Sequence, residues 1–168
     1  EAHARARGAA PLATIAGFGT AFANPATDKT RAVRALRQAM ERALLEAEVS
    51  AGDVDYVLAN GASTPRHDDI EYDAIQQLFG AETAATPVGA SKSMLGHLVT
   101  AAGATDVVLC AKALERQSVP PTLNLDAADP SNRLRFVTTA QPMSMQVALV
   151  NAIGFEGTYA SLVLKKPP

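Results

Sequence analysis

Residues 54–75 read VDYVLANGASTPRHDDIEYDAI, which places a β-rich run, a polar loop and an amphipathic helix one after the other. The run Val54–Ala59 predicts a strand that ends at Asn60 and Gly61. Residues 67–79 predict a helix whose acidic residues lie near its start, where the helix dipole favours them. A strand that leads into a helix is the building unit of an α/β sheet, so this stretch indicates the fold class.

Strands and helices alternate along the rest of the chain as well. Residues 1–10 are expected to be the end of a helix closed by Gly8. Further helices are expected from residue 28 to about 48 with Thr27 and Asp28 as caps, and over residues 96–116. Further strands are expected at residues 12–19, 87–90, 134–138, 147–152 and 160–165, with a loop at residues 20–27. The last helix is apolar almost all round, which predicts burial on most of its faces. The order predicts one compact α/β unit with parallel strands.

The composition excludes several classes of protein. With 168 residues, 48% of them hydrophobic and 19% charged, the chain can bury a core and is neither disordered nor collagen-like. Its net charge of −2 gives nucleic-acid binding little electrostatic support. No apolar run approaches the roughly 20 residues that span a bilayer, and no segment reads as a signal peptide. We therefore expect no nucleic acid, no membrane span and a cytoplasmic location.

Two polar loops follow predicted strands, where the catalytic groups of α/β folds gather. The first loop is residues 60–65, and the second is residues 91–97, which brings Lys92 and His97 in front of an apolar helix. A helix dipole disfavours imidazolium at this end, so His97 is expected to stay neutral and to act as a hydrogen-bond donor or base. A capped surface histidine is the alternative.

The remaining reactive side chains favour structural roles. His67 precedes a helix rich in carboxylates and is expected to be a solvated helix-start residue. Cys110, the single cysteine, lies among valines and leucines, which predicts a packed core thiol and excludes a disulfide framework. The acidic residues between positions 53 and 71 match no metal-ligand loop. The chain therefore contains no credible nucleophile of its own.

Four stretches resemble one protein family and keep its order. Residues 54–75 resemble its VxYVxAHGTSTPxxDxxExxAI stretch, and SKSMLGHLVTAAGATD (91–106) resembles its TKSxxGHxxxAAGxxE segment. VPPTLNLDAADP (119–130) is similar to its VPPTxNLxxPDP loop, and VNAIGFEGTYASLVLKK (150–166) to its SNSFGFGGTNASLVFKR ending. The family is that of the β-ketoacyl-acyl-carrier-protein synthases, condensing enzymes of the thiolase superfamily, and the resemblance covers their C-terminal half.

The resemblance implies a fold and a set of partners. Residues 1–168 are expected to form one thiolase-like half, layered α/β/α around a mixed five-stranded sheet. The N-terminal half, which carries the nucleophile position, is absent from this chain, and a start at Glu1 instead of Met fits a piece of a longer polypeptide. The implied partners are that half, a second ketosynthase subunit in a homo- or heterodimer, and acyl carrier protein. No cofactor is implied beyond the phosphopantetheine on which the carrier delivers acyl and malonyl groups.

The resemblance also implies roles for individual residues. His97 matches the second of two histidines that stabilise an enolate oxygen, an arrangement known as an oxyanion hole. Lys92 matches the family lysine, Glu71 the carboxylate expected to pair with it, and Asp68 the aspartate of the same motif. Residues implied to bind substrate or to shape its loop are Phe155, Gly154, Ser63, Thr64 and Pro65.

Four departures from the family pattern bear on activity. Asn60 stands where the family has its first catalytic histidine, Ala62 replaces a threonine, Glu156 a glycine and Tyr159 an asparagine. An asparagine amide donates a hydrogen bond but carries no titratable proton, and Glu156 is expected to add bulk and charge beside an apolar acyl path. These changes favour a non-elongating protein, either a chain-length-factor-like partner or an acyl-transfer-only synthase. An active decarboxylating enzyme with an Asn60–His97 oxyanion hole and a non-enzymatic interaction module are the alternatives.

Overall fold

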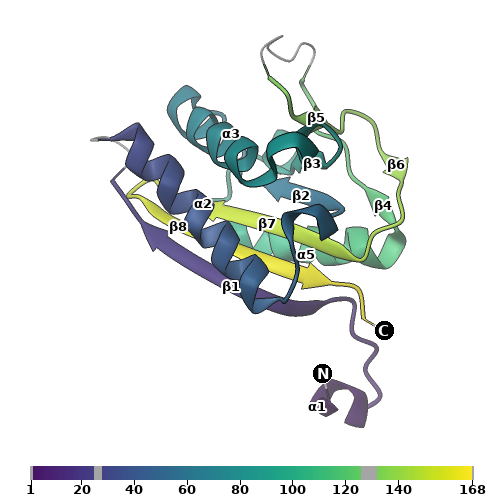
Figure 1. Ribbon diagram of the computed structural model, residues 1–168. Helices are drawn as coiled ribbons and strands as arrows, with labels where there is room; N and C mark the ends of the chain where they lie inside the picture. The colour runs from purple at the N-terminus through teal and green to yellow at the C-terminus, as the bar shows by residue number, and fades with distance from the viewer. Residues whose placement is uncertain (1, 25–27, 126–131, 168) are drawn as a thin grey trace.

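The computed structural model describes residues 2–24, 28–125 and 132–167, and Figure 1 shows their arrangement. The strands are β1 (Thr14–Phe22), β2 (Tyr56–Ala59), β3 (Pro87–Ala90), β4 (Ser118–Val119), β5 (Arg135–Phe136), β6 (Gln141–Pro142), β7 (Val147–Ile153) and β8 (Thr158–Lys165). The α-helices are α1 (Ala2–Ala6), α2 (Lys29–Glu46), α3 (Pro65–Phe79), α4 (Lys92–Leu95) and α5 (Ala102–Arg116). Short 3₁₀ turns are η1 (Ala51–Asp53), η2 (Gly80–Ala84) and η3 (Val99–Ala101).

The main sheet is mixed and has the strand order β1-β8-β7-β2-β3-β5. The strands β7, β2, β3 and β5 run parallel to one another, whereas β8 pairs antiparallel with both β1 and β7. The α/β class is confirmed, but the sheet has six strands where five were expected. The number five came from the family resemblance, whereas all six strands, including the edge strand β5, match strands predicted from the sequence pattern. The strands β4 and β6, which the sequence did not predict, form a separate two-stranded sheet.

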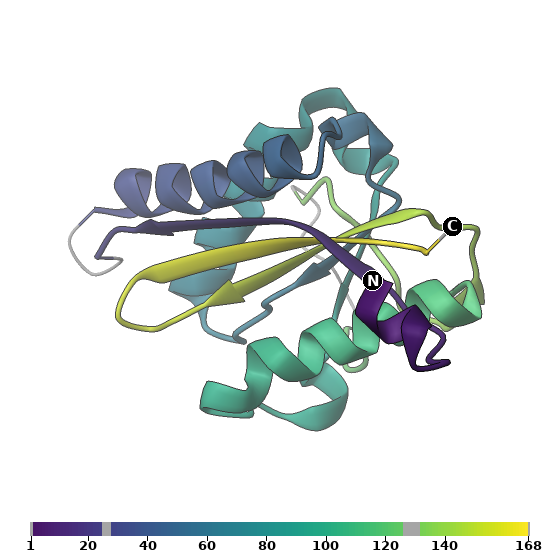
Figure 2. The same cartoon turned by 90° about the horizontal axis from the view of Figure 1, so that it is seen from below.

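Helices cover both faces of the main sheet, and Figure 2 shows α2 on one side and α5 on the other. The helices α2 and α3 share one buried core with the sheet, and α5 packs into a second core on the opposite face. The strand β1 approaches α2 so closely that a Cβ at Gly17 or Gly19 would collide with the helix backbone at Ala43 or Ala39. Glycine in the strand and alanine in the helix therefore bring these two elements into contact.

The helix predicted over residues 96–116 is shorter than expected. It is replaced by α4, a turn at Gly96 with φ 75°, the 3₁₀ turn η3, and α5, which begins only at Ala102. One face of α5 is buried, with Cys110 and Leu114 fully enclosed, but Val108 is 60% exposed. The expectation of burial on most faces is therefore wrong for this chain by itself, although burial raises the pKa of the Cys110 thiol to about 12, as expected for a core cysteine.

The other boundaries differ by a few residues. The strand β1 continues to Phe22, into the predicted loop, because it pairs with β8 along its whole length. Asp28 caps α2 by accepting a hydrogen bond from the Arg31 N–H, as predicted, whereas Thr27 lies outside the described residues. Within the described ranges, no helix has both the length and the apolar composition needed to cross a membrane.

The contact between β1 and α2 leads to a prediction about stability. Gly19→Ala is expected to lower the free energy of unfolding by about 1–3 kcal/mol, because the added methyl group must push the strand away from the helix. Gly52→Ala is the matched control, since its nearest neighbour would be the Ser50 hydroxyl at 3.8 Å. Urea unfolding of both variants measures the difference, and equal stabilities would contradict the close contact.

Candidate active site

Three loops meet at one edge of the main sheet. Because β2, β3 and β7 are parallel, their carboxyl ends lie at the same edge, where α/β proteins bind ligands. Asn60 follows β2, Lys92 lies two residues after β3, and Phe155 lies in the turn after β7. The topology thus brings together predicted site residues that are up to 95 positions apart in the chain.

Asn60 is buried, with 3% of its surface exposed, and most of its polar atoms form hydrogen bonds. Its backbone N–H donates to Glu71 Oε1 at 2.8 Å, and its backbone carbonyl accepts from Lys92 Nζ at 2.5 Å. Its side-chain Oδ1 accepts from the Ile153 N–H at 3.1 Å and from Lys92 Nζ at 3.3 Å. These two donors fix the orientation of the side-chain amide through Oδ1. The other amide atom, Nδ2, has no hydrogen-bond partner among the described residues.

Lys92 forms its ion pair with Asp106 on α5, and not with Glu71 as the resemblance implies. Lys92 Nζ lies 3.2 Å from Asp106 Oδ2, and both side chains are more than 90% buried. The second oxygen of Asp106 accepts a short hydrogen bond from the Ser91 hydroxyl. Asp106 was missed, although it aligns with the final glutamate of the TKSxxGHxxxAAGxxE segment.

Glu71 instead holds the loop that follows β2. Its two oxygens accept from the N–H groups of Asn60 and Gly61, and Oε1 also accepts from Asn151 Nδ2 at 3.2 Å. Asn151 in turn accepts from the Ser161 hydroxyl, which extends this buried network across β7 to β8. Burial raises the pKa of Glu71, and the N–H donors oppose the shift by stabilising the carboxylate.

His97 lies between α4 and η3, directly after the turn at Gly96. Its Nδ1 accepts a hydrogen bond from the Val99 N–H at 3.0 Å, which an imidazolium could not do. With Nδ1 as the acceptor, the ring proton is placed on Nε2. The helix dipole that was expected to act on His97 does not start here, because α5 begins five residues later.

The Nε2 atom of His97 is buried and, like Asn60 Nδ2, has no hydrogen-bond partner within the described parts of the chain. We call these two atoms the open donors. Buried polar groups without a partner are uncommon in native proteins, and each one calls for an explanation. Two such donors at one sheet edge are suited to bind an oxygen that carries negative charge.

Phe155 lies at the tip of the turn between β7 and β8. The turn is closed by hydrogen bonds from the Gly154 N–H to the Thr158 carbonyl and from the Gly157 N–H to the Gly154 carbonyl. The Phe155 ring stacks on the His97 ring, with centroids 5.2 Å apart and an interplanar angle of 25°. It also packs against the His67 ring in a T-shaped arrangement, with centroids 5.1 Å apart and an interplanar angle of 81°.

His67 is therefore not the solvated residue that the sequence predicts. It lies in the first turn of α3, half-buried against Phe155, and its Nδ1 shares a hydrogen bond of 2.9 Å with Thr64 Oγ1. Thr64 is the N-cap residue of α3, and Pro65 occupies the first helical position. No sequence signal identified His67, because the family stretch has a variable position there.

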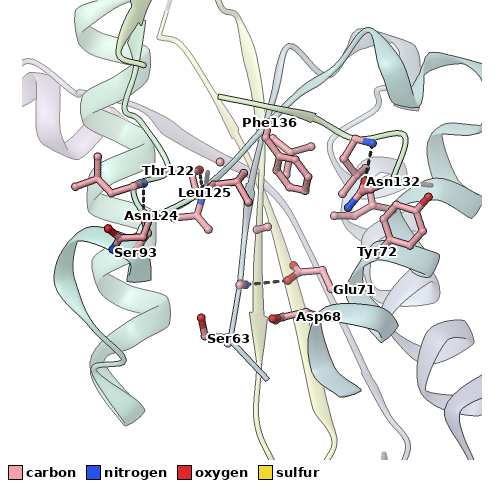
Figure 3. Close-up of a pocket in the computed structure, with 18 residues that line it drawn as sticks. Ser63, Asp68, Glu71, Tyr72, Ser93, Thr122, Asn124, Leu125, Asn132 and Phe136 are labelled. Carbon is pink, nitrogen blue, oxygen red and sulfur yellow. Dashed lines mark hydrogen bonds between the residues drawn. The ribbon is translucent and has the colours of Figure 1, made fainter. Parts of the chain in front are cut away.

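Other residues predicted for the site line a cavity of about 270 Å³ between α3, β3 and residues 122–125 and 132–136. Figure 3 shows Ser63, Asp68 and Glu71 together at one side of it. Burial raises the pKa of Asp68, against the stabilising N–H groups of Ser63 and Ala62. Ser63, with φ 59°, lines this cavity, whereas His97 and Phe155 do not, so the structure does not bring Ser63 together with the aromatic rings.

Two of the departures from the family pattern lie in the turn after β7 and on β8. The Glu156 side chain is exposed and folds back over Gly154, where its own N–H and the Thr158 side chain lower the pKa of its carboxyl group. Tyr159 is fully buried in the core on the α2 side of the sheet. Asn60, in contrast, supplies one of the two open donors.

Known proteins share this sequence and this fold. Residues 12–126 match the family described as beta-ketoacyl synthase, C-terminal domain. The 3-oxoacyl-[acyl-carrier-protein] synthase 2 of Rhizobium meliloti (strain 1021) is 38% identical over 170 residues, which cover 98% of this chain and 39% of that protein.

Two solved structures superpose with a TM-score of 0.90 at 30% identity, each covering 99% of this chain and 41% of its own. One is the AntDE:AntF complex, a type II PKS acyl-carrier protein with its ketosynthase bound to the hexaketide, and the other is the ishigamide ketosynthase/chain length factor. The chain thus spans about two fifths of the length of these relatives. By its sequence and its fold, the chain belongs to the beta-ketoacyl synthase family and corresponds to the C-terminal domain of that family.

Proposed function

We propose that the chain is the C-terminal half of a ketosynthase-type protein that binds carrier-bound acyl thioesters through Asn60 and His97. The observation that supports this proposal is the pair of open donors, each fixed by a hydrogen bond to another atom of the same side chain. A thioester oxygen gains negative charge when it is attacked or when a malonyl group loses CO2. Donors that are oriented before the reaction stabilise that charge at no reorganisation cost.

The protein is proposed to transfer acyl groups without efficient elongation. The amide of Asn60 can donate a hydrogen bond but cannot supply or accept a proton at neutral pH. A decarboxylation that depends on paired histidines therefore loses one proton-carrying group at this position. The open donors argue against a purely structural, chain-length-factor-like role, because such a role does not need buried groups that await a ligand.

A second candidate is an active condensing enzyme that uses the Asn60–His97 pair. The complete network around Lys92, Asp106 and Glu71 favours this candidate, since it holds the site in one arrangement. The nucleophile would then come from the N-terminal half, because Cys110 is enclosed in the core.

That N-terminal half is also proposed as the partner of an uncovered apolar surface. Ile15 and Phe18 are 60% and 51% exposed, and they pair with Leu164 and Leu162 on β8. Directly paired residues share a face of the sheet, and the two leucines pack in the core on the α5 side. The face beside α5, together with exposed Val108 on α5 itself, thus presents apolar side chains that a packed helix of the other half would cover.

Removal of either open donor tests the proposed site. In the complete protein with its N-terminal half, Asn60→Ala and His97→Ala are each expected to slow acyl transfer from an acyl carrier protein by about 100- to 1,000-fold, the usual effect of losing one oxyanion donor. His3→Ala, on the exposed helix α1, is the matched control and should leave the rate unchanged. Unchanged transfer in both site variants would overturn the proposed function.

Release of CO2 from malonyl-carrier protein separates the two candidates. The unaltered protein is expected to release CO2 more slowly than a synthase with two histidines, and Asn60→His is expected to raise the rate because it restores an imidazole. A rate that already equals that of a two-histidine synthase would show an active condensing enzyme instead.

The buried ion pair between Lys92 and Asp106 leads to a prediction about stability. Lys92→Met or Asp106→Leu alone is expected to lower the free energy of unfolding by about 3–5 kcal/mol, because each leaves a buried charge without its partner. The double variant should lose less than the sum of the two. The exposed pair Lys112–Glu115 is the matched control, for which a loss below about 1 kcal/mol is expected in the same urea titration. Equal losses of unfolding free energy at the two ion pairs would contradict the conclusion that Lys92 and Asp106 form a buried pair.

A further inference from the structure

A cluster of three rings lies beside the open donors. The Phe155 ring contacts both the His97 ring and the His67 ring, so the two imidazoles cannot be further apart than the sum of those two centroid distances. His67 comes from the first turn of α3 and His97 from the loop before α5, and the turn after β7 brings Phe155 to both. Asn60 joins the same group, because its Oδ1 accepts from Ile153, two residues before Phe155.

His67 also has a nitrogen that awaits a partner. Its Nε2 is buried and forms no hydrogen bond to any described residue, as is the case for the open donors. The Phe155 ring has no hydrogen-bond donor or acceptor, so packing against it leaves His67 Nε2 without a hydrogen bond. Two of these buried nitrogen atoms belong to rings that contact Phe155, and Asn60 is hydrogen-bonded to Ile153 just before the same turn, so we take the three atoms as candidates for one ligand.

The hydrogen bonding of His67 differs from that of His97. The Val99 N–H can only donate, which fixes the proton of His97 on Nε2. The Thr64 hydroxyl can donate to His67 Nδ1 or accept from it, so His67 can present either an N–H or a lone pair at Nε2. His67 can therefore adapt to the ligand, which neither the fixed amide of Asn60 nor His97 can do.

We propose that His67 is a further substrate-contacting residue, whose Nε2 hydrogen-bonds the carrier-bound acyl thioester on the Phe155 side of the open donors. This inference rests on the proposed function. The polar atom that it meets is an oxygen of the ligand, either the carboxylate of a malonyl group or a carbonyl of the thioester and its amide-containing arm. A role in aromatic packing alone is the alternative, and it predicts that the two ring nitrogens are dispensable.

Two substitutions separate these roles. His67→Phe keeps an aromatic ring against Phe155 and removes both nitrogens, whereas His67→Gln removes the ring and keeps a donor and acceptor at the end of the side chain. In the complete protein with its N-terminal half, binding of acetyl- and malonyl-carrier protein, each with an amide in place of the thioester, is measured by titration calorimetry. His67→Phe is expected to weaken binding by about five- to tenfold, the effect of one lost hydrogen bond, and His67→Gln by less.

The pattern across the two ligands identifies the oxygen. Weaker binding of the malonyl analogue alone assigns the carboxylate, and weaker binding of both analogues assigns a carbonyl. Unchanged binding of both by His67→Phe overturns the inference, as does an equal loss in His67→Phe and His67→Gln. His3→Phe is the control for a histidine far from the site, and thermal unfolding confirms that each variant is folded.

The same titration with Asn60→Ala keeps the two proposals apart. If Asn60→Ala weakens binding and His67→Phe does not, the result supports the proposed function and contradicts the proposed hydrogen bond between His67 and the ligand. If neither variant changes the affinity for either analogue, the proposed function itself fails.

Discussion

The arrangement of the site depends on the hydrogen bonds and the ion pair that the ammonium group of Lys92 forms. It donates to the backbone carbonyl of Asn60, to the side-chain oxygen of Asn60 and to the carboxylate of Asp106. A buried charge is costly unless it is paired and hydrogen-bonded. A movement of the Asn60 loop or of α5 that broke these contacts would leave a buried charge without partners and raise the free energy of the folded state. The charge of Lys92 therefore holds both elements in place.

The two carboxylates around Asn60 come from opposite faces of the sheet. Glu71 reaches the loop from α3, and Asp106 reaches Lys92 from α5. The two helices belong to different cores, so the polar contacts at the edge of the sheet connect layers that apolar packing keeps separate. The position of the Asn60 amide is therefore determined by the whole α/β/α sandwich and not by its own loop.

Local sequence patterns were sufficient for most elements but not for the contacts between them. The helix α2, the strand β3 and the loop after β2 follow from hydrophobic spacing and turn residues, because these signals lie within one segment. The pairing of Lys92 with Asp106 and the contact of His67 with Phe155 join residues from separate segments, which periodicity does not encode. The late start of α5, at Ala102 instead of residue 96, has the same origin, since Gly96 and the His97–Val99 contact override an apolar composition.

A histidine in an oxyanion hole performs two tasks, since it donates a hydrogen bond and it can carry a proton. In the proposed site, the fixed donor and the adaptable ring lie on different side chains, Asn60 and His67. The amide of Asn60 supplies a donor whose direction is fixed by Lys92 and Ile153, and its proton does not titrate. The His67 ring has an adjustable proton, because its partner is a hydroxyl group that can turn. In the proposed site, the amide at position 60 therefore contributes a fixed donor without a titratable proton, and the proposed contact of His67 adds a donor or acceptor on the Phe155 side.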